Sequence, residues 1–161
     1  MSDQASAGAP TMTVGADHLE LISFEIGGQE FCIDIRAVRE IRGWTAPTPM
    51  PRTPDYIQGV INLRGAVMPV VDLRKRLGLG VTEPSSRHVI VVVQHEQRMC
   101  GLLVDAVQET FMVDVSLLQP PPAMATYAKE LFVDAMIPLE GRMLSRLVVG
   151  SLLPLDELNA A

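Results

Sequence analysis

Apolar and polar residues alternate along much of this chain with the two-residue period of half-buried strands. The alternation is clear over residues 22–26 and again over residues 31–35. Between them, Gly27-Gly28 offers a turn that tolerates positive φ angles. The pattern predicts a β-hairpin near the start of the ordered chain.

The segment that follows the hairpin has two interpretations. Asp34 could cap a short helical turn through Val38, whereas Glu40-Ile41-Arg42 could begin a strand. Periodicity does not separate these alternatives over so few residues. Prolines at positions 47, 49, 51 and 54 then exclude a regular ladder, because proline lacks a backbone donor. Thr53-Pro54 predicts a single helical turn, ended by Gly59.

A second hairpin is predicted from two apolar strands, residues 60–63 and 66–71, which meet at Arg64-Gly65. Pro69 should lie at an edge or a bulge of this hairpin. A short helix follows, with Asp72 as its N-cap and Gly78 as its stop signal. The basic residues 74–76 are near the C-terminal end of this helix, where the helix dipole favours cations. They are interpreted as a solvated helix end.

The second half of the chain predicts only strands and turns, apart from a short final helical segment that Ser151 caps and that ends near Leu158. The strands are predicted at residues 89–93 (buried on both faces), 99–104, 107–113, 132–137 and 143–149. Nine or ten short strands indicate an all-β barrel architecture. The proline-rich breaks favour two barrels over one flat sheet.

Composition limits what such a fold can bind. The chain has 161 residues, which suits one domain, and 48% of them are apolar. With 13 Lys and Arg against 19 Asp and Glu, the net charge is −6, which argues against nucleic acid as a partner. Cys32 and Cys100 are isolated in sequence and are expected to be reduced and buried.

Residues 1–16 are small and polar, and we expect them to form a disordered tail before a single domain at residues 17–158. The tail has no signal-peptide pattern, and the longest aliphatic run, at residues 89–93, is too short to span a membrane. The expectation is therefore a cytoplasmic protein that does not insert directly into a membrane.

No catalytic or cofactor motif is evident. His18, His88 and His95 are scattered, and the segment beginning His95-Glu96 lacks the second histidine of a zinc-protease motif. A glycine-rich phosphate loop and a nucleophile elbow are also absent from the sequence. We therefore expect no catalytic residue, metal or cofactor, and favour protein–protein recognition. The alternative is a small β-barrel enzyme or ligand carrier with a cryptic pocket.

Four segments of the chain are distinctive: Val38-Arg39-Glu40-Ile41, Gly59-Val60-Ile61-Asn62-Leu63-Arg64-Gly65, Gly101-Leu102-Leu103-Val104-Asp105-Ala106-Val107 and Gly141-Arg142-Met143-Leu144. In that order, they resemble the V-x-E-I, G-V-x-N-L-R-G and G-x-x-V-D-x-V elements and the last hairpin of the CheW family of bacterial chemotaxis adaptors. The resemblance extends over about residues 18 to 158. The chain departs from the family at Ala135, where glycine is common, and at Ser145-Arg146, where aliphatic residues are usual.

The resemblance implies two intertwined five-stranded SH3-like barrels with short helical turns and no catalysis. It implies a scaffold that joins the cytoplasmic tip of transmembrane chemoreceptors (methyl-accepting chemotaxis proteins) to the regulatory domain of the histidine kinase CheA. By position, Glu40 and Arg64 would form an ion pair near the receptor groove. The residues that would line or border that groove are Val38, Ile41, Gly59, Val107 and Thr110. A CheW-like domain cut from a larger kinase or a receiver-fused coupler is a further alternative, against which the length of the chain argues.

Overall fold

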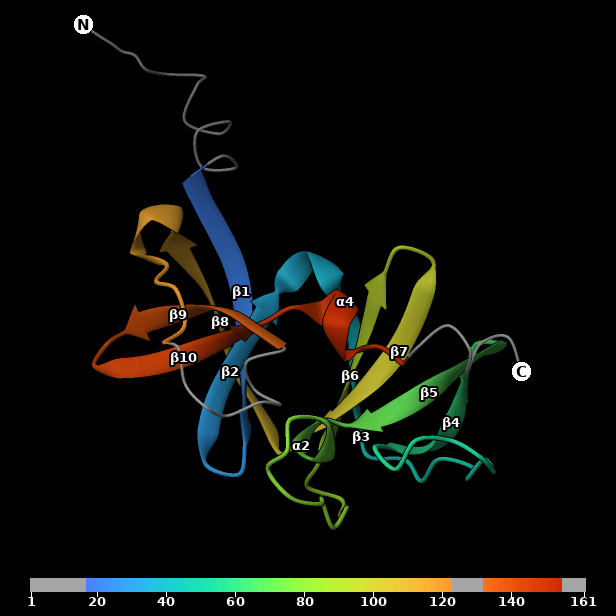
Figure 1. Ribbon diagram of the computed structural model, residues 1–161. Helices are drawn as coiled ribbons and strands as arrows, with labels where there is room; N and C mark the ends of the chain where they lie inside the picture. Colours follow the sequence, from blue (N-terminus) through green and yellow to red (C-terminus); the bar gives the residue numbers. More distant parts are fainter. Residues whose placement is uncertain (1–16, 123–131, 155–161) are drawn as a thin grey trace, which may run out of the picture.

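The computed structural model describes residues 17–122 and 132–154, which form two five-stranded sheets (Figure 1). This confirms the predicted all-β class and its two five-stranded units. The strands are β1 (His18–Ile26), β2 (Gln29–Asp34), β3 (Val38–Gly43), β4 (Ile57–Leu63), β5 (Ala66–Asp72), β6 (Val89–His95), β7 (Arg98–Val104), β8 (Ala106–Asp114), β9 (Val133–Leu139) and β10 (Arg142–Leu147). The helical elements are η1 (Ile35–Ala37), α2 (Leu73–Arg76), η2 (Val115–Leu117) and α4 (Val149–Leu152).

The two sheets are intertwined along the chain. We call the sheet with the order β8-β1-β2-β10-β9 the terminal sheet, because it takes strands from both halves of the chain. The sheet with the order β3-β6-β7-β5-β4 is the central sheet, and its strands are consecutive in sequence. Figure 1 shows the two sheets side by side, with α2 and α4 near their junction.

The strand arrangement of one sheet repeats that of the other. In each sheet, one parallel pair joins two antiparallel hairpins: β5 with β7 in the central sheet, and β10 with β2 in the terminal sheet. Each sheet also has an isolated bridge to one of its edge strands. Thr48 bridges Val60 of β4, and Gln119 bridges Met136 of β9. The strands β3 to β7 therefore correspond to β8, β9, β10, β1 and β2.

The correspondence extends to single residues on the edge strands β3 and β8. Each strand has a one-residue irregularity in its ladder, after Val38 in β3 and after Val107 in β8. The next paired residue is Glu40 in one strand and Glu109 in the other. Val38, Glu40 and Ile41 thus occupy the same positions as Val107, Glu109 and Thr110.

A shared apolar core lies between the sheets, and each sheet has a smaller core of its own. Strand β6 shows why both of its faces are apolar. Val91 and Val93 point into the shared core, whereas Ile90 and Val92 belong to the core inside the central sheet. All four side chains are fully buried, as the prediction of a strand buried on both faces requires.

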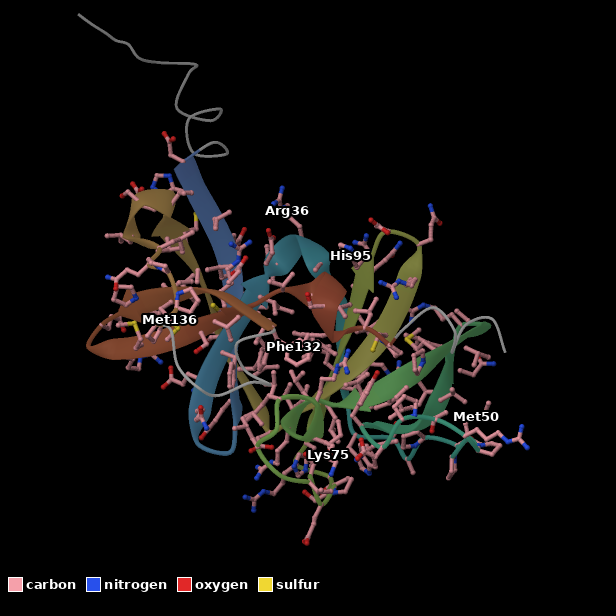
Figure 2. The ribbon with its side chains drawn as sticks, in the orientation of Figure 1. Arg36, Met50, Lys75, His95, Phe132 and Met136 are labelled. Carbon is pink, nitrogen blue, oxygen red and sulfur yellow. The ribbon has the colours of Figure 1, made fainter. Side chains whose placement is uncertain are left out.

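Polar contacts also join the two sheets. The Asp105 carboxylate, between β7 and β8, accepts hydrogen bonds from Gly27 N at 2.8 Å and from Arg74 Nη2 at 2.9 Å. Arg76 stacks on the rings of Tyr56 and Phe132, at 4.0 and 5.0 Å from their centroids. Figure 2 shows Phe132 between the sheets. The interpretation of the basic residues 74–76 as solvated is therefore wrong for Arg74 and Arg76.

The predicted helical turn after Thr53-Pro54 and the predicted cap at Ser151 need correction. The single helical turn after Thr53-Pro54 is absent; a turn closed by Ile57 N and Pro54 O at 3.1 Å replaces it, because Ile57 joins the β4–β5 ladder opposite Val71. Ser151 lies inside α4, whose N-cap is Val148, and residues 155–158 fall outside the described residues. The predicted tail at residues 1–16 also lies outside them.

Asp72 precedes α2, as predicted, but its carboxylate does not cap the helix. It is buried and accepts instead from Thr82 N at 2.9 Å and Thr82 Oγ1 at 2.6 Å, which fixes the loop after α2. Pro69 lies inside β5, an internal strand, and pairs in register with Val60 of β4, so the predicted edge or bulge position is wrong. The ladder of β5 with β7 begins only at Val70, so it does not require the donor that proline lacks.

Candidate functional site

The candidate site begins on β3, an edge strand of the central sheet. Its residues alternate between half-buried and exposed, and Glu40 and Arg42 are both on the half-buried face. Arg42 Nη1 lies 3.1 Å from Glu40 Oε2. The second Glu40 oxygen, Oε1, accepts a hydrogen bond from Arg64. The structure thus forms the predicted ion pair and adds a second arginine to it.

Arg64 is placed by a tight turn at the tip of the β4–β5 hairpin. Arg64 and Gly65 have φ angles of 53° and 86°, which is the combination of a type I′ turn. The side chain of Asn62 stabilises this turn, because its Oδ1 accepts from Gly65 N at 2.9 Å. The backbone of the turn is therefore fixed, while the Arg64 side chain is 72% exposed.

Gly59 is buried on β4, where the segment after β3 crosses the sheet edge. Its φ angle is 147°, and a Cβ atom built there would lie 2.3 Å from Thr48 O. That oxygen accepts from Val60 N at 2.9 Å in the bridge beside the open edge. Gly59 therefore permits the close approach that brings the ends of the central sheet together.

Val38 and Ile41 are on opposite sides of β3. Val38 is half-buried and packs against the shared core, whereas Ile41 is 46% exposed. Of these two predicted groove residues, only Ile41 thus offers a largely accessible apolar surface.

Val107 and Thr110 are on β8 and so belong to the terminal sheet. Val107 packs against the same shared core as Val38, whereas Thr110 is exposed and opposite Ile22 of β1. The seven predicted residues therefore come from both sheets. Five are in the central sheet, on the edge strand β3 and on the β4–β5 hairpin, and two are on β8 of the terminal sheet, at the positions that correspond to Val38 and Ile41.

The terminal sheet has its own ion cluster at the position that corresponds to Glu40. Arg142, just after the β9–β10 turn, contacts Glu109 Oε2 at 2.8 Å and Glu30 Oε1 at 2.9 Å. Glu140 Oε1, in the same turn, is 3.9 Å from Arg142 Nη2. Sequence reasoning missed this cluster, although Arg142 is a basic residue beside the turn of a predicted hairpin, as Arg64 is.

The two arginines influence the ionisation of Glu40. Hydrogen bonds from Arg64 first and Arg42 second lower the pKa of the Glu40 carboxyl below its ordinary value of 4.5. Glu40 is therefore ionised at neutral pH. Sequence reasoning did not assign Arg42 to the site, although a residue two positions from Glu40 on a strand shares its face.

A cleft of about 360 Å³ lies at the junction of the sheets beside α4. Arg36 and His95, both labelled in Figure 2, are among its lining residues. Its acidic residues are already paired, Asp34 with Arg36 at 2.9 Å and Asp134 with Arg146 at 3.6 Å. These charges are compensated within the protein.

The described residues contain no group of three or more His, Cys, Asp or Glu side chains arranged to hold a metal ion. Cys32 and Cys100 are buried free thiols, and burial raises the pKa of each to about 12. Among residues 17–122 and 132–154, no helix is both long and apolar enough to cross a membrane.

Comparison with known proteins places these features in a family. The CheW-like domain family matches residues 20–157. The chemotaxis protein CheW of Rhizobium meliloti (strain 1021) is 49% identical over 155 residues, covering 93% of this chain and all of that protein. The CheW protein of Bacillus subtilis (strain 168) is 30% identical, over 88% of this chain and 91% of its own length. The crystal structure of the scaffolding protein TtCheW from Thermoanaerobacter tengcongensis aligns with a TM-score of 0.75 and 32% identity, covering 81% of this chain and 88% of that one.

Proposed function

Since this chain belongs to the CheW family of chemotaxis scaffolds, we propose that it couples transmembrane chemoreceptors to the histidine kinase CheA. In this role it acts in the cytoplasm, at receptor arrays, and performs no chemistry of its own. Its partners are the cytoplasmic tip of a methyl-accepting chemotaxis protein and the regulatory domain of CheA.

The observation that carries the receptor side of this proposal is the Glu40–Arg64 contact. It joins the edge strand β3 to the β4–β5 turn, beside the exposed Ile41, and both segments are among the residues that match the family. A helical receptor tip would bury an apolar stripe against such a surface. We place the receptor interface at Val38, Glu40, Ile41, Gly59 and Arg64, with Val107 and Thr110 on the terminal sheet.

Arg64→Ala tests this interface more cleanly than a change at Val38, because Val38 also packs against the shared core. We expect Arg64→Ala to weaken binding to a purified receptor cytoplasmic fragment by about 2 kcal/mol or more, as truncation of an interface arginine does. The melting temperature should change little, since the Arg64 side chain is largely exposed. Sedimentation or calorimetric titration would measure the affinity.

Arg39→Ala is a matched control, because Arg39 is an exposed arginine on the same strand and donates to Gln94 at 2.8 Å instead of to Glu40. It should leave receptor binding unchanged. Unaltered binding of Arg64→Ala would place the receptor interface elsewhere on the molecule.

A further inference from the structure

Residues 148–154 cross from one sheet to the other, and we call them the strap. They leave β10 of the terminal sheet, form α4 beside β6, and end near β7 of the central sheet (Figure 1). At that end, Arg98 Nη1 donates to Pro154 O at 2.8 Å. In the middle, Gly150 lies directly on β6, because a Cβ atom at this position would be 2.7 Å from His95 Nε2. The strap thus connects the last strand of the terminal sheet to the surface of the central sheet.

Side chains hold the strap in place. Arg76 of α2 donates to the carbonyl oxygens of Ser151, Leu152 and Leu153 at 3.2, 3.3 and 3.4 Å. These carbonyls are at the C-terminal end of α4, where backbone acceptors lack helical partners and a cation is favoured. Val149, Leu152 and Leu153 also bury their side chains in the shared core. An arginine therefore supplies the donors that a neighbouring strand supplies elsewhere in the fold.

Arg76 also contacts an aromatic ring on each side of the junction. Its guanidinium lies 4.0 Å from the centroid of the Tyr56 ring and 5.0 Å from that of Phe132. Tyr56 O accepts from Asp72 N at 2.7 Å and is thereby anchored to β5 of the central sheet. Phe132 O accepts from Val148 N at 2.8 Å, just before β9 of the terminal sheet. One side chain thus touches the central sheet, the terminal sheet and the strap.

The two sheets are separate hydrogen-bonded units. Every strand pairing of the described residues lies within one sheet, so the sheets are joined by the shared core and by polar side chains. Apolar burial is not directional, whereas the hydrogen bonds of a planar guanidinium are. The Asp105 carboxylate, bound to Gly27 N and Arg74, fastens the junction at the β7–β8 connection. The strap fastens it at a second point, and two points define an angle that one point leaves free.

We propose that the strap fixes the angle between the two sheets and that Arg76 is its catch. When Arg76 releases the strap carbonyls, the strap loosens and the sheets move as two rigid units about the Asp105 contact, with both sets of ladders intact. This is a hinge motion. It goes beyond the proposed function, since it is a property of the protein without a partner. The motion changes the spacing between β3 and β8, which carry the two parts of the proposed receptor interface.

Hydrogen exchange tests whether the strap opens locally. The full-length protein is compared with Arg76→Met, which keeps an unbranched side chain against the two rings but loses every donor. The amides of residues 149–153 should exchange about tenfold faster or more in the variant, because hydrogen bonds to a charged group are lost. The amides inside the internal strands β1 and β6 should keep their rates. Equal acceleration through both sheets, or a strap that exchanges at its original rate, would overturn the proposal.

A distance measurement tests whether the sheets move. Spin labels are attached at Val67→Cys on β5 and Met143→Cys on β10, two exposed positions on different sheets. Cys32 and Cys100 do not compete for the label, because both are buried and burial raises the pKa of each thiol to about 12. Adding Arg76→Met should broaden or shift the distribution of distances between the labels. An identical distribution would show that the strap does not set the angle.

Lys75→Met is the matched control, because Lys75 is on the same helix and pairs with Asp55 at 3.5 Å, outside the strap. It removes the same charge and should change neither the exchange rates nor the distances. Arg76→Lys is the milder variant if Arg76→Met does not fold. Its ammonium can bond a carbonyl but lacks the planar fork, so exchange of the strap should still accelerate, though less than in Arg76→Met. A strap as protected in Arg76→Lys as in the unmodified protein would contradict the role of Arg76 as the catch.

Discussion

In the central sheet, one glutamate is held by two arginines, and in the terminal sheet, one arginine is held by three glutamates. The backbone positions of Glu40 and Glu109 are nonetheless the same, since both follow the irregularity of an edge strand. Arg64 is 72% exposed, whereas Arg142 is 32% exposed. The comparison teaches that the repeated arrangement decides where an ion cluster forms, while the residues at equivalent positions decide the sign of its charge.

The sheets also differ where the linker after the edge strand bridges the opposite edge. Gly59 precedes the bridging Val60 in the central sheet, and Ala135 precedes the bridging Met136 in the terminal sheet. Ala135 is buried with its methyl group in place. A methyl group at Gly59 would instead meet the carbonyl of Thr48. The segment after the edge strand therefore leaves no room for a methyl group at Gly59 of the central sheet, whereas the terminal sheet has room for one at Ala135.

The largest effect on stability is expected when Gly59 is given the methyl group that Ala135 has. Gly59→Ala should lower the free energy of unfolding by about 3 kcal/mol or more, because the new Cβ would overlap backbone and the φ angle is unfavourable for alanine. Denaturant unfolding measures this change. The reciprocal change, Ala135→Gly, removes a methyl group from a strand and should cost only about 1 kcal/mol. Equal losses at the two positions would contradict the comparison.

An intermediate effect on stability is expected from removing the side chain of Arg142 or Arg64, the arginines at the two corresponding hairpin turns. Arg142→Ala would leave Glu30, Glu109 and Glu140 near one another without a cation, so the melting temperature should fall at low salt and recover partly at high salt. Arg64→Ala leaves Glu40 paired with Arg42 and should have the smaller effect. A larger loss from Arg64→Ala would show that the central cluster, and not the terminal one, stabilises its sheet.

The smallest effect concerns the titration of Glu40. Its pKa is lowered in the folded protein, so the stabilisation by this contact is present at pH above 4.5 and is lost as the pH falls through the lowered pKa. Arg64→Ala should raise the pKa of Glu40 toward 4.5 but not all the way, because Arg42 remains. Carboxyl-detected NMR titration would measure both values. An unchanged Glu40 titration in the variant would mean that Arg64 does not contact it in solution.

Local patterns in the sequence predict most of the strands and their turns. The hairpins at Gly27-Gly28, Arg64-Gly65 and Gly141 are confirmed, since alternation and positive-φ positions are local properties. The elements that were mispredicted depend on distant contacts. Ile57 extends a strand because Val71 lies opposite, and the Asp72 carboxylate binds Thr82 instead of a helix end. A short window of sequence contains neither partner.

The candidate site was less accessible to such reasoning. Glu40 and Arg64 are far apart in sequence, and only the family resemblance indicated their pairing, which the structure then confirmed. The cluster around Arg142 was missed because it joins three strands whose order in the sheet is not encoded by spacing. The correspondence of the two sheets was also hidden, since equivalent positions have different residues, as Arg64 and Glu140 do. The interface roles of the seven predicted residues stay predictions.

The order of strands has a consequence for synthesis on the ribosome. The β1–β2 hairpin emerges first, but its neighbours β8 and β10 are the last strands of the terminal sheet to be made. The central sheet, by contrast, is complete once β7 has emerged, and it can pair without waiting for any later strand. Until β8 to β10 arrive, the nascent hairpin leaves its edges unpaired, although its apolar residues Ile22, Phe24 and Ile26 can already cover the central sheet through the shared core. The central sheet thus offers an apolar surface to the first hairpin before the other strands of the terminal sheet have been made.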